Sequence, residues 1–337
     1  MGLAVSSSLE AIALVSGLSV TYRPDGSQLV RALDQATLSI RPGERVGVLG
    51  ESGSGKSTLA AAFLRLLPAD ARYESGLVQF KGRDVLALPE SELRQIRGAE
   101  IALIPQDPAL VLNPVLSVGN QIAEVLRAHS RMNARERARR VDELLSEVGF
   151  DRPQDIKTAY PYQLSGGQRQ RIVIAQAMVC RPALVIADEP TSKLDASLQQ
   201  QILSLMQELS QRHRTALVLI THDPTVLAGA ADRIAVMYAG RIVEEGSAEE
   251  VFRHPLHPYT QALVRLAGRY LSTERSRARF PAIGGEPPNL HSRTKGCAFA
   301  PRCPERMQVC TERELEETAP EGSHRVSCFL YDRRREQ

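Results

Sequence analysis

The sequence predicts an α/β protein with a mostly parallel sheet, an antiparallel β lobe, a helical subdomain and a small C-terminal domain. Two observations carry this fold class. A short apolar strand at residues 46–49 leads through a glycine-rich loop into a helical stretch at 57–67. Two apolar runs of buried-strand type, residues 184–187 and 216–220, flank a helical pattern at 197–212. Such β-α-β alternation is typical of a parallel sheet.

The remaining elements follow along the chain. Alternating apolar residues at 18–22 and 36–40, separated by the turn-rich segment 24–27, predict the antiparallel β lobe. Residues 114–149 are rich in helix formers and charges and belong to the helical subdomain, which we place at about 107–168.

A boundary is predicted after this region. From residue 265 the chain loses clear apolar periodicity, and residues 281–288 are rich in Pro and Gly. We therefore predict a main domain at residues 1–265 and a C-terminal domain at 266–337.

Composition excludes several classes of protein. The 337 residues are 43% hydrophobic and 24% charged, which suits one large globular core with a smaller addition. A formal net charge of +3 argues weakly against a nucleic-acid partner. No apolar run approaches the roughly 18 residues of a spanning helix, and the N-terminus does not resemble a secretory signal. These features predict a cytosolic protein.

The glycine-rich loop predicts phosphate binding. Small residues let backbone N–H groups surround phosphates, and Lys56 would reach the β and γ phosphates of a nucleotide. The hydroxyl of Ser57 would bind Mg²⁺. The loop reads Gly50, Glu51, Ser52, Gly53, Ser54, Gly55, Lys56, Ser57, and Thr58 follows it.

Two carboxylates, Asp188 and Glu189, end the strand at 184–187. Ligands bind at this edge of a parallel sheet, and phosphoryl transfer needs one acid for Mg²⁺ and another for the attacking water. Alone, such a pair would more often cap the next turn. Together with the glycine-rich loop it favours the catalytic interpretation.

A third motif, Leu164-Ser165-Gly166-Gly167-Gln168, precedes a helix-like stretch and suits a second anion-binding helix start. With the loop at 50–57, the acid pair at 188–189 and His222 in order, the chain resembles the ABC ATPase family over roughly its first three quarters.

The resemblance implies roles for single residues. Tyr22 would stack on adenine, Gln106 would be the glutamine that contacts Mg²⁺ or water and couples to membrane subunits, and Glu189 would be the general base. His222 would contact the γ phosphate. Magnesium would be held by Ser57, Gln106 and Asp188. Residues Ser165, Gly166, Gly167 and Gln168 would meet ATP bound to an opposite ATPase subunit.

Three further stretches resemble the peptide and nickel uptake group of ABC transporters, most closely its D-type dipeptide and oligopeptide ATPases. They are Gln106-Asp107-Pro108 with Leu112-Asn113-Pro114, the segment 254–260, and the cysteine-bearing tail. The resemblance implies a second, different ATPase subunit, two permeases and an external solute-binding protein. The sequence departs from the family pattern at Lys193, where a small residue is usual. This change would either alter communication between subunits or have no effect.

Four of the five cysteines lie in the tail: Cys297, Cys303, Cys310 and Cys328. A segment with so little apolar content needs a cross-link or a bound metal to fold. Four cysteines are compatible with an iron–sulfur cluster, with zinc or with unliganded thiols. The D-type resemblance implies a four-iron four-sulfur cluster. His324, near the fourth cysteine, is expected at the surface, with a role as a substitute ligand as the alternative. Cys180 is expected in the core.

The sequence therefore predicts an ATP-hydrolysing motor of a peptide importer at the cytoplasmic face of the membrane. Three alternatives stay open: an importer of nickel or another small solute, a soluble ABC ATPase that acts on nucleic acid or ribosomes, and a regulatory subunit that does not hydrolyse ATP.

Overall fold

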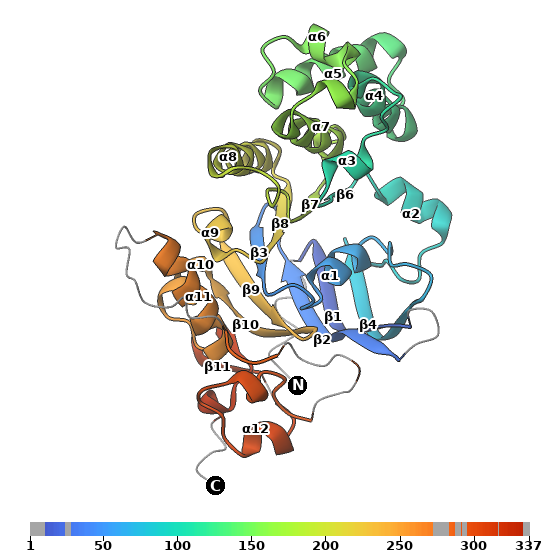
Figure 1. Cartoon of the computed structure of the whole chain (residues 1–337). Coiled ribbons are helices and arrows are strands. Elements are labelled where there is room, and N and C mark those ends of the chain that lie inside the picture. The colour runs from blue at the N-terminus through green and yellow to red at the C-terminus, as the bar shows by residue number, and fades with distance from the viewer. Residues whose placement is uncertain are drawn as a thin grey trace. The chain divides into compact units, whose positions relative to one another are not determined.

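The structure is a computed structural model that describes residues 11–23, 28–271, 283–286, 291, 295–315 and 317–332 (Figure 1). The chain divides into two compact units, one built mainly from residues 80–220 and the other from residues 14–39, 46–79 and 221 onwards. The N-terminal residues 1–10, the predicted turn at 24–27 and half of the predicted break at 281–288 lie outside the described residues. The domain boundary after residue 265 stays a prediction.

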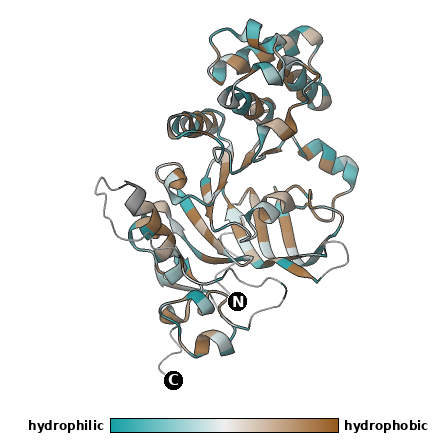
Figure 2. Ribbon diagram, viewed as in Figure 1, coloured by the Kyte–Doolittle hydropathy of each residue, from teal (hydrophilic) through white to brown (hydrophobic). Residues whose placement is uncertain are grey.

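The first unit is built on three parallel strands. Strand β7 (Leu184–Asp188) lies between β6 (Ile101–Ile104) and β8 (Ala216–Thr221) and pairs with both in parallel. Four consecutive residues of β7 are fully or almost fully buried, and these strands are mostly brown in Figure 2. This burial confirms the two buried strands predicted from the apolar runs. Strands that are covered on both faces are rich in apolar side chains, which is why such runs predict them.

Helices make up most of the rest of the first unit. Helix α5 starts with a capping box between Asn133 and Glu136. Each of the two side chains accepts the backbone N–H of the other residue. Among the arginines of this helix, Arg140 is buried and donates to Glu147 at 2.9 Å. The bounds are β5 (Arg83–Asp84), α2 (Glu90–Ile96), α3 (Pro108–Val111), α4 (Val118–His129), α5 (Ala134–Glu147), α6 (Pro153–Thr158), α7 (Gly166–Met178) and α8 (Ala196–His213).

The second unit contains two groups of strands. The order β2-β1-β4 forms the predicted β lobe, and β3 pairs in parallel with β9, which pairs antiparallel with β10. The bounds are β1 (Ala13–Tyr22), β2 (Val30–Ile40), β3 (Arg45–Leu49), α1 (Lys56–Ala62), β4 (Ala71–Phe80), α9 (Pro224–Leu227), β9 (Arg233–Tyr238), β10 (Arg241–Ser247), α10 (Ala248–Arg253) and α11 (Pro258–Leu271).

The tail continues the sheet of the second unit. Strand β12 (His324–Val326) pairs antiparallel with β10 and with β11 (Thr318–Glu321), so that Val326 lies opposite Glu244. Short turns and α12 (Val309–Glu312) carry the cysteines. Backbone pairing with β10 therefore helps to hold a segment that has little apolar content of its own.

One prediction for the tail is wrong: His324 is buried, with 1% of its surface exposed. Its Nε2 lies 2.8 Å from Oε1 of Glu244, a carboxylate that also accepts the backbone N–H groups of Leu256 and His257 at 2.8 and 2.7 Å. A buried carboxylate needs several donors to offset its lost hydration, and His324 supplies one of them.

Candidate nucleotide site

The phosphate-binding loop requires glycine for steric reasons. A Cβ atom on Gly50 would lie 2.3 Å from the carbonyl oxygen of Met237, and one on Gly55 would lie 2.3 Å from that of Ala32. Gly53 and Gly55 also have φ angles of 81° and 102°, a conformation that L side chains rarely adopt. The loop lies between β3 and α1, as the sequence predicted.

Lys56 is held inside this loop. Its Nζ donates to the carbonyl oxygens of Gly50 and Glu51, at 2.8 Å in each case, and lies 3.4 Å from the Ser54 hydroxyl. The side chain is buried, whereas Ser52, Gly53 and Ser57 are exposed. The ammonium group is thus directed by the backbone of its own loop.

Tyr22 lies near the start of α1. Its hydroxyl donates to Oγ1 of Thr58 at 3.2 Å, and burial raises the pKa of the phenol. The contact ties the end of β1 to the residue after Ser57. A role for the ring in stacking on adenine stays a prediction.

In the first unit the structure brings Gln106 and Glu189 together. Nε2 of Gln106 donates to Oε2 of Glu189 at 3.1 Å. Glu189 follows Asp188 at the end of β7 and has a φ angle of 47°, which is unfavourable for a residue other than glycine. Its backbone N–H donates to the Ile220 carbonyl at 2.9 Å, and this bond to β8 holds the turn. The positive φ has no local sequence signal.

The third motif starts α7 as a capping box. The Ser165 hydroxyl accepts the Gln168 N–H at 3.2 Å, and Oε1 of Gln168 accepts the Ser165 N–H at 2.9 Å. Gly166 has open space where a Cβ would lie, whereas a Cβ on Gly167 would lie 2.5 Å from Cδ2 of Leu198. Gly167 thus serves close packing against α8, and Gly166 leaves the helix start accessible.

Two further predicted residues lie on exposed turns. His222 follows β8 and has an exposed side chain. Lys193 donates to Oδ2 of Asp107 at 2.5 Å, and this contact, with the Ala109 N–H, lowers the pKa of the Asp107 carboxyl. The unusual Lys193 therefore pairs with Asp107, the residue that follows Gln106.

All four tail cysteines line one pocket, together with His257 and Phe329. Burial and the neighbouring thiols raise the pKa of Cys297 to about 11 and that of Cys328 to about 12. Nδ1 of His257 accepts the Tyr259 N–H at 3.0 Å, whereas its Nε2 is buried and has no hydrogen-bond partner within the described part of the chain.

This pocket does not have the geometry of a single-ion site. Across the described residues, no three His, Cys, Asp or Glu side chains could together hold one metal ion. Cys180 does not line this pocket and is half-buried in the first unit.

Sequence reasoning missed the surroundings of Glu51. Its carboxylate pairs with Arg302 of the tail, and its backbone N–H donates to the hydroxyl of Tyr259. An acidic residue among the small residues of a phosphate-binding loop was the available signal, but nothing local identified a partner 251 residues away.

Comparison with known proteins agrees with this geometry. Residues 33–192 match the ABC transporter family, and residues 243–310 match the C-terminal region of oligopeptide/dipeptide transporters. The fold resembles the dimeric structure of MJ0796, a bacterial ABC transporter cassette, with a TM-score of 0.63 and 30% identity over 70% of this chain and 98% of that one.

Two relatives extend the likeness to nearly the whole chain. The dipeptide transport ATP-binding protein DppD of Bacillus subtilis (strain 168) is 41% identical over 97% of both chains. The oligopeptide transport ATP-binding protein OppD of Escherichia coli (strain K12) is 43% identical over 92% of this chain and 91% of its own. Over the residues that the structure describes, no helix has the length and apolar character needed to span a membrane. The chain belongs to the ABC transporter family, among the dipeptide and oligopeptide transport ATP-binding proteins, and is an ATP-hydrolysing subunit.

Proposed function

We propose that this ATPase drives import of peptides as a peripheral subunit at the cytoplasmic face of the cell membrane. The contact between Gln106 and Glu189 carries the catalytic part of this proposal, because it joins the residue expected to sense the membrane subunits to the expected base. The similarity of the C-terminal region to peptide transporters supports the choice of substrate.

Nucleotide binding uses the exposed loop backbone. The N–H groups of Gly53, Gly55 and the residues that follow would bind the phosphates, with Lys56 on the β and γ phosphates. The ring of Tyr22 would stack on adenine. Magnesium would be held by Ser57, Gln106 and Asp188 together with the phosphates, and an ion bound largely by substrate oxygens needs no cluster of protein acids.

Hydrolysis then needs a base and a γ-phosphate contact. Glu189 would accept a proton from the attacking water, whose oxygen forms the new bond to the γ phosphorus while the bond to the ADP oxygen breaks. His222 would contact the γ phosphate, which its exposed position permits. The products are ADP and inorganic phosphate.

The motif at residues 164–168 would contact the ATP that is bound to a partner ATPase subunit. Ser165 and Gly166 are exposed at the start of α7, so the start of this helix is accessible to an opposing chain. We infer a heterodimer with a second ATPase subunit that acts on two permeases, which receive solute from an external binding protein. No nucleic-acid partner is expected.

Reconstitution tests this function. The chain would be expressed with its permeases and partner ATPase and placed in liposomes. ATP turnover should rise when peptide and the binding protein are added, and Glu189→Gln should remove that turnover. Stimulation by nickel but not peptide would reassign the substrate, and full turnover without permeases would contradict the coupling.

We propose further that the four tail cysteines hold a four-iron four-sulfur cluster. The fit rests on one pocket lined by all four thiols, with the unpartnered His257 Nε2 beside them as a donor. Four thiolates can ligate either one zinc ion or such a cluster, and the resemblance of the tail to that of the D-type ATPases favours the cluster. The cluster would supply folding energy to the segment that carries the cysteines.

Metal analysis tests this assignment. After anaerobic purification, iron and sulfide should each approach about four per chain. Cys310→Ser should lower the iron content, whereas the matched change Cys180→Ser should not. Stoichiometric zinc without iron would contradict the cluster.

A further inference from the structure

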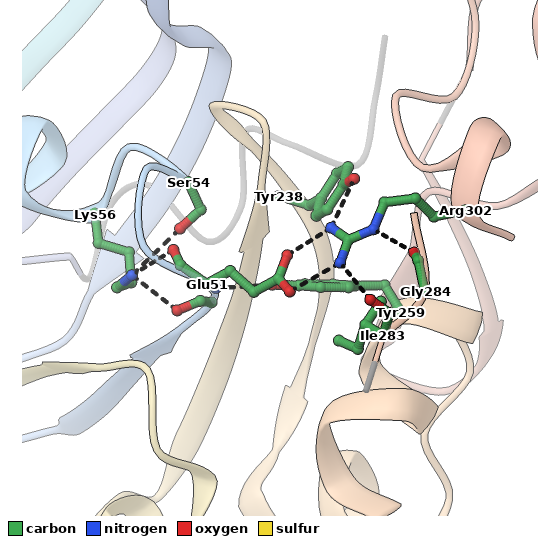
Figure 3. Close-up of polar contacts among 9 residues, drawn as sticks. Glu51, Ser54, Lys56, Tyr238, Tyr259, Ile283, Gly284 and Arg302 are labelled. Carbon is green, nitrogen blue, oxygen red and sulfur yellow. Dashed lines mark hydrogen bonds and ion pairs between the residues drawn. The ribbon is translucent and has the colours of Figure 1, made fainter. Parts of the chain in front are cut away.

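Glu51, the second residue of the phosphate-binding loop, is held by the C-terminal part of the chain (Figure 3). Nη1 of Arg302 donates to Oε2 of Glu51 at 2.7 Å, and Nη2 donates to Oε1 at 3.0 Å. The Glu51 backbone N–H donates to the hydroxyl of Tyr259 in α11 at 2.8 Å. Both the side chain and the backbone of one loop residue are therefore tied to residues far along the sequence.

The guanidinium of Arg302 is oriented by contacts that do not involve Glu51. Nε donates to the Gly284 carbonyl at 2.9 Å, Nη2 to the Ile283 carbonyl at 3.1 Å, and Nη1 to the hydroxyl of Tyr238 at 3.3 Å. With the two bonds to Glu51, these use all five N–H donors of the group. The side chain is 4% exposed. Arg302 thus presents a preoriented fork to the loop.

The loop residue that Arg302 holds also directs the phosphate-binding groups. The Glu51 carbonyl accepts from Nζ of Lys56 at 2.8 Å and from the Ser54 N–H at 3.1 Å. A shift of Glu51 would therefore move the acceptors that place Lys56. The effect would reach the part of the loop that binds the β and γ phosphates.

We propose that Arg302 is a positioning residue for ATP binding. By its two hydrogen bonds to Glu51 it keeps the phosphate-binding loop in its binding conformation, so that the cysteine-bearing tail contributes to nucleotide affinity. Arg302 ends the turn Ala300–Arg302 and precedes Cys303, so the backbone that carries the guanidinium belongs to the segment between two cysteines. This role adds to the proposed transport function and does not depend on the identity of the metal or the solute.

A double-mutant cycle on the full-length chain tests the proposal. The dissociation constant of fluorescent mant-ADP with Mg²⁺ would be measured for wild type, Arg302→Gln, Glu51→Gln and the double variant. Each single change should raise the dissociation constant about tenfold, because a loop that has lost its preorganising contact must be ordered when the nucleotide binds. The double variant should be no weaker than either single one, since both remove the same contact.

Matched variants separate positioning from general damage to the tail. Arg325 also lies in the tail and pairs with Glu245 at 2.8 Å, so Arg325→Gln should leave the affinity within about twofold. Arg302→Lys keeps the charge but loses the fork and should fall between wild type and Arg302→Gln. In ATPase assays of Arg302→Gln, the KM for ATP should rise, whereas kcat at saturating ATP should stay within about twofold of the wild-type value.

Several outcomes would overturn the proposal. Unchanged affinity in a folded Arg302→Gln variant, or additive losses in the double variant, would show that the pair does not act on the loop. If Arg302→Gln fails to fold, Glu51→Gln leaves the tail untouched, and unchanged affinity in that variant is decisive against the role.

Discussion

The two units hold their nucleotide-site residues in different ways. In the second unit Lys56 is buried and has three acceptors within its loop, and the loop itself is tied to Arg302 and Tyr259. In the first unit Gln106 is exposed and meets Glu189 in a single hydrogen bond.

This difference separates two tasks. Binding phosphates needs donors that are already oriented before the ligand arrives, because orientation lost on binding weakens affinity. Hydrolysis that responds to membrane subunits needs a contact that can be made and broken, and one exposed hydrogen bond is weak enough for that. We therefore expect changes in the second unit to alter binding and stability, and changes in the first unit to alter turnover.

The largest effect should follow Glu189→Gln. The amide cannot accept the proton of the attacking water, so turnover in the assembled complex should fall by about 10² to 10⁴. Nucleotide affinity should stay unchanged, because the phosphate-binding loop is intact. Single-turnover hydrolysis and mant-ADP binding measure the two quantities. Turnover that persists in this variant would mean that another group is the base and would break the comparison.

Lys56→Met should have the opposite signature. Removing the ammonium group should raise the nucleotide dissociation constant by roughly ten- to a hundredfold, since hydrogen bonds to charged groups contribute roughly 1.5 to 3 kcal/mol. Titration with mant-ADP measures the change. Lys157→Met is the matched control, because Lys157 pairs with Asp142 at 3.0 Å on the helices of the first unit. An equal loss of affinity in the control would point to unfolding.

Tyr259→Phe tests the scaffold beneath the loop. The ring is fully buried against Tyr238 and Phe299, with centroids 4.6 and 5.4 Å apart, and phenylalanine keeps this packing. The Glu51 N–H loses its acceptor, which should lower the free energy of unfolding by about 1 to 3 kcal/mol. Urea titration would measure it.

The counterpart in the first unit is Gln106→Ala, which removes an exposed hydrogen bond. It should change the free energy of unfolding less than Tyr259→Phe does, because water can replace the lost partner. Equal destabilisation of Tyr259→Phe and Gln106→Ala would contradict the contrast between a preoriented phosphate-binding loop and a loosely held Gln106.

The sequence predicted the motifs whose chemistry is local. The loop at residues 50–57 lies between a strand and a helix, and the acid pair follows a buried strand, because both patterns depend on neighbours in the chain. The pairing of β12 with β10 and the partner of Glu51 were not predicted, since they join residues that are distant in sequence.

The error on His324 has the same origin. A histidine in a polar tail is usually exposed, and only the fold places it against the buried carboxylate of Glu244. The left-handed backbone at Glu189 also escaped prediction, because it is imposed by hydrogen bonds such as that to the Ile220 carbonyl and not by residue type. Local chemistry was thus readable, whereas the geometry that tunes it depends on tertiary contacts.

The smallest effect is expected at Lys193, whose side chain is 59% exposed. Lys193→Ala should leave turnover within about twofold of wild type, because exposed ion pairs contribute little. The pKa of Asp107 should rise towards its ordinary value of about 3.9, since Lys193 is the main cause of its lowering. The pair can contribute only while Asp107 is ionised, so any difference in stability should vanish as the pH falls through the lowered pKa of Asp107 in the folded wild type. NMR titration of Asp107 measures the shift, and a large loss of peptide-stimulated turnover would instead show that this contact beside Gln106 takes part in communication between subunits.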